Sequence, residues 1–297
     1  MIVHPASGFH YVNVFPKNIV FDEIFACYRA SSQWNPWMSA VQEDPRNLPV
    51  DDPSAFIVFW QALPEILNRP TAAKKALRYT ESMNVDPSRP ENQKRHFEHF
   101  EAAARNVDCV IAHTPTAVGI LEKYAKHVIL VPIGYESSVY GVPDWTVTKT
   151  ADIGFYGSMV GKRGAVIEAM AERFGRRLRT FNSFGWARKA DLDRCRMTLY
   201  VGHCEDPSFA TTRLWQAVAG SAALATEGRD AWPAFPDRHY VRLPKADPGN
   251  MGPFLDSLER ALAGNLEAVA QTAHIELSKF TVKECMESYL IPSAGVR

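Results

Sequence analysis

Short apolar runs alternate with segments of helical spacing through the second half of the chain. The run ADIGFYG, residues 151–157, ends at a glycine and predicts a buried strand. From Lys162 to Phe174 the apolar residues stand three and four positions apart, which predicts a helix, and Gly175 occupies the expected C-cap position. The same reasoning predicts further strands at 178–181, 197–201, 222–226 and 240–243 and further helices at 187–196 and 211–219.

The end of the chain is predicted to be helical. An apolar stripe ends at Gly264, and Asn265 can cap the helix that follows. Thr281, followed three residues later by Glu284, fits a capping box that opens a last helix. The stripe consists of Phe254, Leu255, Leu258 and Leu262.

The first half follows the same alternation less regularly. Its clearest strand is AFIVFW at 55–60, and a turn-rich stretch, MNVDPSRP, follows the next predicted strand. The remaining predictions for this half are strands at 76–80, 107–112 and 127–131 and helices at 21–30, 91–105 and 115–124.

This order of elements predicts the fold class. Strands that alternate with helices of about ten residues imply parallel sheets covered on both faces. The segment 134–150 has few long apolar runs and is the natural boundary. We therefore predict an α/β fold of two Rossmann-like, doubly wound domains, 1–145 and 146–297, that face a cleft and are closed by the C-terminal helices. Ligands in such sheets bind beyond the carboxyl ends of the strands.

Composition limits the partners and the location. The 297 residues, 46% of them hydrophobic, suffice for two domains with packed cores. A formal net charge of zero argues against a broad electrostatic grip on nucleic acid or an anionic membrane. No apolar run is long enough for a membrane span, and the start lacks the pattern of a signal peptide. Five irregularly spaced cysteines do not indicate a disulfide framework, so we expect a cytoplasmic protein.

Three residues of the second half could be considered as metal ligands, but the sequence does not favour a metal site. Cys195, His203 and Cys204 carry metal-binding groups, but the chain has no paired CxxC motif. Packing or loop roles are the better interpretation of these three residues, and no metal ligand is predicted.

The segment FYGSMVGKRG, residues 155–164, joins a predicted strand to a predicted helix. Glycines there let the backbone approach a phosphate, and unpaired N–H groups at a helix start attract an anion. Lys162 and Arg163 add positive charge at the same place. Neither the P-loop spacing nor the dinucleotide GxGxxG pattern is present. A strand-to-helix turn with a solvated basic first turn is the alternative.

A second candidate segment is DPSFATTRLWQAVAG. Thr211 and Thr212 open the predicted helix, so hydroxyl and N–H groups collect at its start. Arg213 stands in that first turn, where a cation opposes the helix dipole unless an anion also binds. Gln216 lies one turn after Thr212 and can share its face. The alternative is that Arg213 pairs with a neighbouring carboxylate such as Asp206.

A basic stretch connects the two segments. Residues 162–196 include ten Lys/Arg and four Asp/Glu. Such a run is either a solvated helix face or a surface that collects a polyanionic partner.

The C-terminal half resembles the donor domain of GT-B-fold glycosyltransferases, especially spore-maturation-type and group-1-like members. The resemblance covers about residues 150–290, and in the first 150 residues it depends on the order of elements. The closing FTVKECMESYL resembles the helix that finishes the fold in these enzymes. The matching pieces are IGFYGSMVGKRG, MTLYVGH, SFATTRLWQAVAGSAALATEG and HYVRL.

The resemblance implies a diphosphate pocket and a ribose contact. Gln216 stands where such enzymes usually carry a glutamate that holds the ribose, and an amide can still hydrogen-bond a hydroxyl. The acidic pair of many retaining members is missing, because Ser208 stands at its first position. The stereochemistry of transfer is therefore left open. The predicted donor-binding residues are Gly157, Ser158, Lys162, Arg163, Thr211, Thr212, Arg213 and Gln216.

These features predict a nucleotide-sugar-dependent hexosyl- or glycosyltransferase that acts on a hydroxyl acceptor without a metal ion or cofactor. The acceptor hydroxyl must lose a proton to a carboxylate or histidine of the N-terminal domain. Glu81 and His113, which follow predicted strands, are the catalytic candidates, with His4 a weaker third. Each also has a plain structural interpretation, as a surface, capping or packing residue.

Two other functions fit the same residues. Gln216 and the missing acidic pair favour a nucleotide-binding or scaffold protein that keeps the fold without activity. The basic stretch, with Trp34, Trp37 and Trp186, is compatible with glycosylation of modified bases in DNA, although ordinary packing is the favoured interpretation of the tryptophans. The acceptor is left open among a glycan, a small molecule, a protein and a modified DNA base.

Overall fold

The computed structural model divides the chain into two compact units. The first comprises Met1–Val85, Arg89–Gly134 and Thr281–Arg297, and the second Asp86–Ser88 and Tyr135–Phe280. The sequence suggested a domain boundary after residue 145, which is further along the chain than the division between Gly134 and Tyr135. The predicted boundary stays a prediction. The structure describes residues 9–12, 38–41, 56–60, 72, 74–78, 101–113, 115–159, 161–183, 185–202, 211–227 and 237–290.

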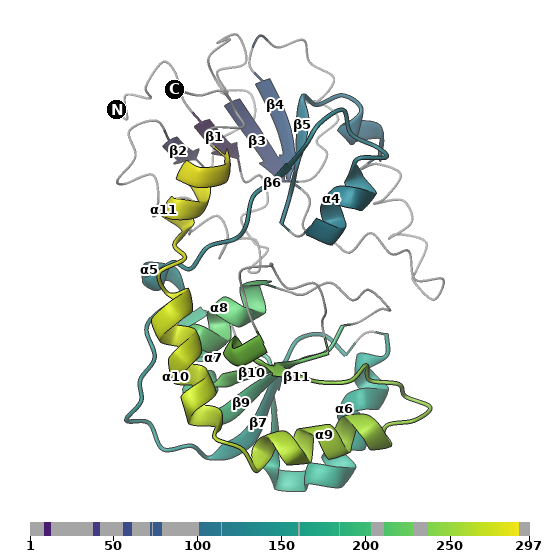
Figure 1. Ribbon diagram of the computed structural model, residues 1–297, viewed down its shortest axis with the longest axis vertical. Helices are drawn as coiled ribbons and strands as arrows, with labels where there is room; N and C mark the ends of the chain where they lie inside the picture. The colour runs from purple at the N-terminus through teal and green to yellow at the C-terminus, as the bar shows by residue number, and fades with distance from the viewer. Residues whose placement is uncertain are drawn as a thin grey trace. The chain divides into compact units, whose positions relative to one another are not determined.

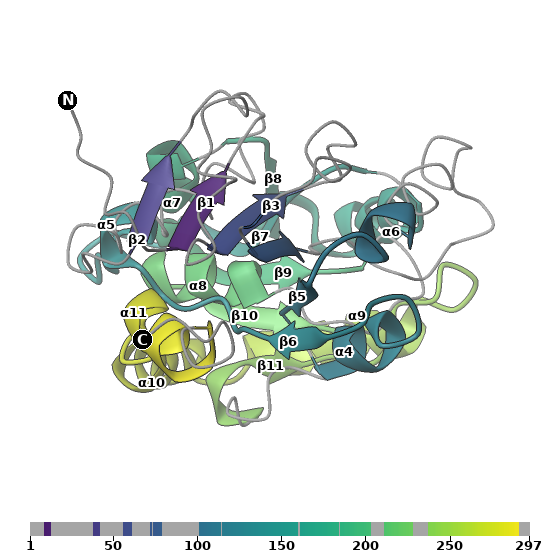
Figure 2. The ribbon, with the colours of Figure 1, turned by 90° about the horizontal axis from the view of Figure 1, so that it is seen from above.

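The first unit is built on a six-stranded parallel sheet. Its elements are β1 (Phe9–Val12), β2 (Met38–Val41), β3 (Phe56–Trp60), β4 (Lys74–Arg78), β5 (Cys109–Ala112), α4 (Pro115–Leu121), β6 (Val128–Leu130), α11 (Val282–Cys285) and η4 (Met286–Leu290). The strand order is β2-β1-β3-β4-β5-β6, and Figure 2 shows β2, β1 and β3 side by side. Because η4 contacts β6, the end of the described chain returns to this unit.

The sequence predicted most of these strands and missed two. The predictions at 55–60, 107–112 and 127–131 correspond to β3, β5 and β6, and β4 begins two residues before the predicted 76–80. The strands β1 and β2 were not predicted. Of the predicted helix 91–105 the structure describes a helical stretch at 101–104, and the predicted helix 21–30 lies outside the described residues.

The second unit is built on a five-stranded parallel sheet in the order β11-β10-β9-β7-β8. The strands are β7 (Ala151–Tyr156), β8 (Leu178–Phe181), β9 (Cys195–Tyr200), β10 (Ala223–Thr226) and β11 (Val241–Arg242). The helices are α5 (Ser137–Tyr140), α6 (Arg163–Phe174), η2 (Gly175–Arg177), α7 (Gly185–Asp193), α8 (Thr211–Ala219), η3 (Asp237–His239), α9 (Gly252–Leu262) and α10 (Leu266–Leu277).

Helices cover both faces of this sheet. Successive side chains of a strand point to opposite faces. In β7, Ile153 and Phe155 pack into the core formed with α6 and α9, whereas Tyr156 contacts residues of α7 and α8. Figure 1 shows α6 and α9 on one side of the strands and α7 and α8 on the other. The predicted doubly wound, Rossmann-like architecture is confirmed for this unit.

One predicted boundary in this unit is wrong. The sequence extended a helix over 187–196, but α7 ends at Asp193 and β9 begins at Cys195. Cys195 pairs with Ala151 of β7, and a Cβ on Gly154 would lie 2.7 Å from its sulfur atom. Pairing with β7 therefore overrides the helical spacing that the isolated segment displays.

The predicted helix caps are confirmed. Gly175 follows α6 with φ 53°, a conformation that favours glycine. The Asn265 side chain accepts a hydrogen bond from the Ala268 N–H, and Thr281 and Glu284 form the reciprocal capping box. Within the described ranges, no helix combines the length and apolar character needed to cross a membrane.

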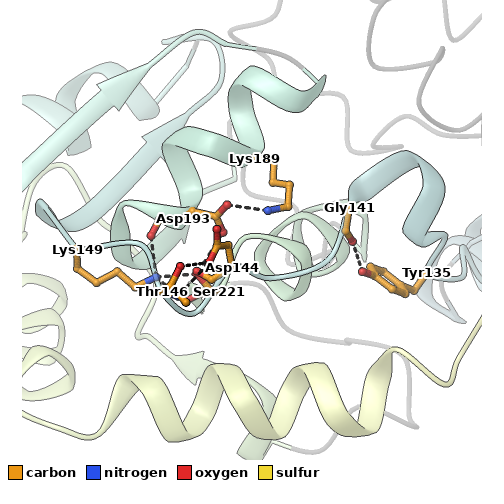
Figure 3. Close-up of polar contacts among 8 residues, drawn as sticks. All are labelled: Tyr135, Gly141, Asp144, Thr146, Lys149, Lys189, Asp193 and Ser221. Atoms are coloured by element: carbon orange, nitrogen blue, oxygen red, sulfur yellow. Dashed lines mark hydrogen bonds and ion pairs between the residues drawn. The ribbon is translucent and has the colours of Figure 1, made fainter.

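The segment that leads into β7 is held to the second unit by a half-buried lysine, Lys149 (Figure 3). Lys149 Nζ donates to the carbonyl oxygen of Asp193 at 2.9 Å, to that of Ser221 at 2.9 Å and to Ser221 Oγ at 2.8 Å. Lys189 forms an ion pair with the Asp193 carboxylate at 2.7 Å. Burial lowers the pKa of Lys149. Because an ammonium has three N–H groups and all three donate to these oxygens, Lys149 has a structural role.

These contacts lie at the amino ends of the strands. Lys149 precedes β7, Asp193 precedes β9 and Ser221 precedes β10. Ligands of parallel α/β sheets bind at the opposite, carboxyl ends. Polar contacts therefore hold the amino ends of the strands of the second unit, and the candidate site is expected at their carboxyl ends.

Candidate functional site

Two arginines meet a glycine turn at the carboxyl end of β7. Gly157 has φ 134°, which L side chains rarely adopt. A Cβ there would lie 3.2 Å from Nη2 of Arg213 and 3.7 Å from Nη1 of Arg163. Arg163 begins α6 and Arg213 stands in the first turn of α8, so guanidinium groups from two helices converge on one backbone turn. This arrangement offers positive charge and accessible backbone to an anion.

The Arg213 side chain is held by the strand that precedes the turn. Its Nη1 donates to the Tyr156 carbonyl oxygen at 3.0 Å, and its Cζ lies 3.9 Å from the centre of the Tyr156 ring. Among the described residues no carboxylate pairs with Arg213. The alternative partner that the sequence suggested, Asp206, lies outside those residues, so that alternative stays untested.

Arg163 is fixed by the neighbouring strand. Its side chain is buried, and Nε donates to the Val201 carbonyl oxygen at 2.7 Å, just beyond β9. The Cζ atom lies 6.0 Å from the centre of the Tyr200 ring. The end of β9 thus orients Nη1 of Arg163 toward Gly157, the residue that follows β7. Arg163 itself begins α6, where the first N–H groups of the helix have no intrahelical partner.

Lys162 is engaged by a carboxylate that the sequence reasoning missed. Its Nζ lies 2.9 Å from Glu227 in an ion pair whose side chains are 10% and 7% exposed. Glu227 also accepts from the backbone N–H groups of Gly202 at 2.8 Å and Ala246 at 2.6 Å. The sequence could have indicated Glu227, because an acidic residue directly after the apolar strand ALAT lies at the carboxyl edge of the sheet, where ligands bind. The charge of Lys162 is therefore compensated within the protein.

Gln216 is joined to the same strand end. The buried Tyr156 hydroxyl donates to Gln216 Oε1. The Tyr156 ring stacks on Phe181, with ring centres 5.6 Å apart and planes 17° apart, and Arg188 Cζ lies 5.0 Å from its centre. Tyr156 and Arg188 were not predicted as site residues. Both could be found only once α7 and α8 were placed against β7.

Other predicted donor residues are less well defined. Ser158 follows Gly157 and is exposed. Thr211 and Thr212 open α8 as predicted, but their side chains lie outside what the structure describes.

His113 lies at the carboxyl end of β5 in the first unit. It is buried, and its Nδ1 is 2.6 Å from the Val131 carbonyl oxygen. A carbonyl oxygen only accepts, so Nδ1 carries the hydrogen and, in the neutral ring, Nε2 carries the lone pair. The other catalytic candidates, Glu81 and His4, lie outside the described residues.

Of the three residues weighed as metal ligands, the structure describes Cys195 alone. Cys195 is buried, and burial raises the pKa of its thiol to about 11. His203 and Cys204 lie outside the described ranges. Within those ranges no three His, Cys, Asp or Glu side chains form a group that could hold a metal ion.

The basic stretch between 162 and 196 is largely paired with acidic residues. Besides Lys162 and Lys189, four arginines of this stretch have carboxylate partners. These pairs are Arg173–Glu259 at 2.7 Å, Arg177–Asp152 at 2.5 Å, Arg179–Asp191 at 3.3 Å and Arg196–Asp152 at 3.2 Å. Trp186 is 64% exposed, while Trp34 and Trp37 lie outside the description. The stretch therefore reads more as a solvated, charge-balanced surface than as a polyanion site.

Comparison with known proteins gives structural likeness alone. No family model matches the chain, and no curated protein sequence matches it. HepE of Anabaena, solved with UDP and glucose, is similar with a TM-score of 0.64 at 8% identity, over 95% of this chain and 97% of that one. Sucrose-phosphate synthase from Thermosynechococcus elongatus gives 0.58 at 12%, over 92% and 78%.

TarM is similar over a smaller share. Its TM-score is 0.56 at 10% identity, and the match covers 79% of this chain and 54% of TarM, so the chain spans about half of that protein. These similar structures are GT-B glycosyltransferases. They do not confirm the resemblance to the spore-maturation type, which stays a prediction. Likeness at such low identity establishes a fold, and the fold of this chain is GT-B.

Proposed function

We propose that the chain is a glycosyltransferase that moves a sugar from a nucleotide-sugar donor to a hydroxyl acceptor. The observation that carries the proposal is the convergence of Arg163 and Arg213 on Gly157, at the carboxyl end of β7. Support also comes from HepE, a similar structure solved with UDP-glucose. A nucleoside diphosphate carries the negative charge that such a turn attracts.

The site is proposed to stabilise the leaving diphosphate without a metal ion. Arg163 and Arg213 would contact the phosphate oxygens, and Gly157 and Ser158 would let the backbone approach them. Preorganised guanidinium and N–H groups can stabilise developing negative charge on the leaving group. Lys162, paired with Glu227, would hold the start of α6 in place.

His113 is proposed to accept the proton of the acceptor hydroxyl. Its Nδ1–H is bonded to Val131, which fixes the tautomer in which Nε2 is the basic nitrogen. His113→Gln should then lower kcat for transfer while leaving the affinity for the nucleoside diphosphate nearly unchanged. Glu81 stays the alternative base.

A nucleotide-binding protein without activity is the second candidate. Gln216 supports it, because its amide is engaged by Tyr156 and cannot act as the acidic group that the related enzymes carry. Under this candidate the same turn would bind a nucleotide, and no bond would be broken.

The two candidates separate in one set of measurements. Thermal unfolding is followed with UDP, GDP, ADP and UDP-glucose, and release of nucleoside diphosphate from the sugar donor is assayed in parallel with and without EDTA. Under the main proposal UDP or another diphosphate raises the Tm, and Arg213→Ala removes the increase. Arg176→Ala is the matched control, because Arg176 is exposed in η2 beside the amino end of β8.

Each outcome has a clear meaning. No stabilisation by any of the diphosphates or by UDP-glucose would refute both candidates. Stabilisation without donor hydrolysis or transfer would favour the inactive binding protein. Loss of turnover in EDTA, restored by a divalent cation, would overturn metal independence alone.

A further inference from the structure

We propose that Tyr156 is the positioning residue of the donor site, holding the phosphate-binding arginine and the ribose-binding amide in register with each other. The inference rests on the proposed function, because it assigns Arg213 and Gln216 to a nucleotide. Tyr156 is the last residue of β7 and lies directly before Gly157.

The first line of argument is the contact with Arg213. The guanidinium Cζ lies 3.9 Å from the ring centre, and Nη1 donates to the carbonyl oxygen of the same residue at 3.0 Å. One residue thus supplies both a flat surface and a hydrogen-bond acceptor to the arginine. A guanidinium fixed in this way loses less freedom when it binds a phosphate than one on a flexible chain.

The second line is the contact with Gln216. The phenolic hydroxyl donates to Oε1, so the carbonyl side of the amide is turned toward Tyr156. Whatever Nε2 meets, it can only donate. The site therefore presents an N–H donor where a glutamate would present an acceptor, and the ribose contact changes from accepting a hydroxyl hydrogen to donating to a hydroxyl oxygen.

The third line is that the Tyr156 ring cannot move away from these partners. Its side chain is buried, Phe181 stacks on it, and Arg188 Cζ lies 5.0 Å from its centre. Arg188 is itself buried and donates to the Ser183 carbonyl oxygen at 3.1 Å. The ring is thereby held from α7 and β8 while it orients two residues of α8.

The test separates the hydroxyl from the ring. Tyr156→Phe keeps the surface under Arg213 and removes the bond to Gln216, whereas Tyr156→Leu removes both. Binding of UDP and of inorganic pyrophosphate is measured by calorimetry for the full chain and both variants. Tyr240→Phe is the matched control, because Tyr240 is a buried tyrosine of the same unit that lies before β11.

We expect a split between the two ligands. Tyr156→Phe should weaken UDP about three- to tenfold, as expected for one lost hydrogen bond, and leave pyrophosphate within about twofold. Tyr156→Leu should weaken both ligands at least about tenfold, because the cation–π contact is also lost. Tyr240→Phe should change neither. Tm is recorded for every variant, so a loss of folding is distinguished from a loss of affinity.

Two kinds of result would overturn the inference. If the wild-type chain binds UDP and Tyr156→Phe binds both ligands as tightly as wild type, or weakens both equally, Tyr156 has no positioning role and the proposed function stands. If the wild-type chain binds pyrophosphate but neither UDP nor another nucleoside diphosphate, the proposed function fails, and the inference with it. Unfolding of Tyr156→Leu leaves the phenylalanine variant to decide.

Discussion

The ion pair between Lys162 and Glu227 offers a sharp test of how the carboxyl edge of the second sheet is held together. Glu227 joins the end of β9, the loop after β11 and the start of α6 through Gly202, Ala246 and Lys162. We predict that Glu227→Gln, which nearly preserves the shape of the side chain, destabilises the second unit strongly. The reason is that it leaves the Lys162 ammonium buried without a carboxylate.

The magnitude follows from burial. The two side chains are 10% and 7% exposed, so the pair is screened little by water. Removing one partner of a buried ion pair costs about 3–5 kcal/mol, and we expect Glu227→Gln in that range. Lys162→Met should cost less, about 2–3 kcal/mol, because Glu227 keeps two backbone N–H donors. The double variant should be less destabilised than the sum by about 1–3 kcal/mol.

Two measurements check this prediction. Urea unfolding gives the free energy of unfolding for the wild type, both single variants and the double variant. Hydrogen–deuterium exchange over residues 196–202 and 241–250 reports the two N–H groups that donate to Glu227, and both segments should exchange faster in Glu227→Gln.

An exposed ion pair of the same unit is the matched control. Arg173 and Glu259 lie 2.7 Å apart with side chains 46% and 43% exposed. Such pairs contribute about 0–1 kcal/mol, so Glu259→Gln should have a small effect. If Glu227→Gln lowers the free energy of unfolding no more than Glu259→Gln does, and exchange at Gly202 and Ala246 is unchanged, the Glu227 carboxylate does not hold β9, the loop after β11 and the start of α6 together.

Three further predictions concern single positions. Gly157→Ala should weaken UDP binding at least about tenfold by calorimetry, because its φ is 134° and the new Cβ would lie 3.2 Å from Arg213; unchanged affinity would exclude the turn as the phosphate site. Gly134→Ala should destabilise the first unit by about 3 kcal/mol or more in urea, since its Cβ would lie 2.4 Å from the Thr281 backbone, and a normal midpoint would contradict that packing. Burial lowers the pKa of His274, so as the pH falls the unfolded chain takes up a proton before the folded chain does, and stability should fall below about pH 6.5. His274→Gln should reduce the dependence of the urea midpoint on pH between about pH 7.5 and 5. An unchanged pH dependence would exclude this histidine as the cause.

Sequence reasoning succeeded where local signals determine local structure. The run 151–157 and the helix that ends at Gly175 were both predicted, because a buried parallel strand is a continuous apolar run and a C-cap glycine has its own conformational reason. The capping box at Thr281 was predicted for the same kind of reason, since its two partners are three residues apart.

Sequence reasoning failed where distant segments meet. Glu227 follows a strand that the sequence identified, yet its partner Lys162 is 65 residues away, and nothing local reveals the pair. Tyr156 was within a quoted segment, but its role depends on how α8 packs against β7. The strand β9 was predicted at 197–201, but its first two residues, Cys195 and Arg196, were assigned to the preceding helix, because the pairing of Cys195 with Ala151 cannot be inferred from one segment.

The contacts made by residues 135–149, the segment that Lys149 ends, determine where the second unit can be separated from the rest of the chain. A fragment that begins at residue 146 loses the Asp144 carbonyl oxygen that accepts from Ser221, and it loses Tyr135, which packs near Trp215. A fragment from Tyr135 to Phe280 keeps these contacts, and it keeps the backbone hydrogen bond from the Tyr135 N–H to the Phe280 carbonyl oxygen, which brings its two ends together. We expect the longer fragment to express as a folded domain suited to nucleotide titrations, and the shorter one to be prone to proteolysis at its new amino terminus.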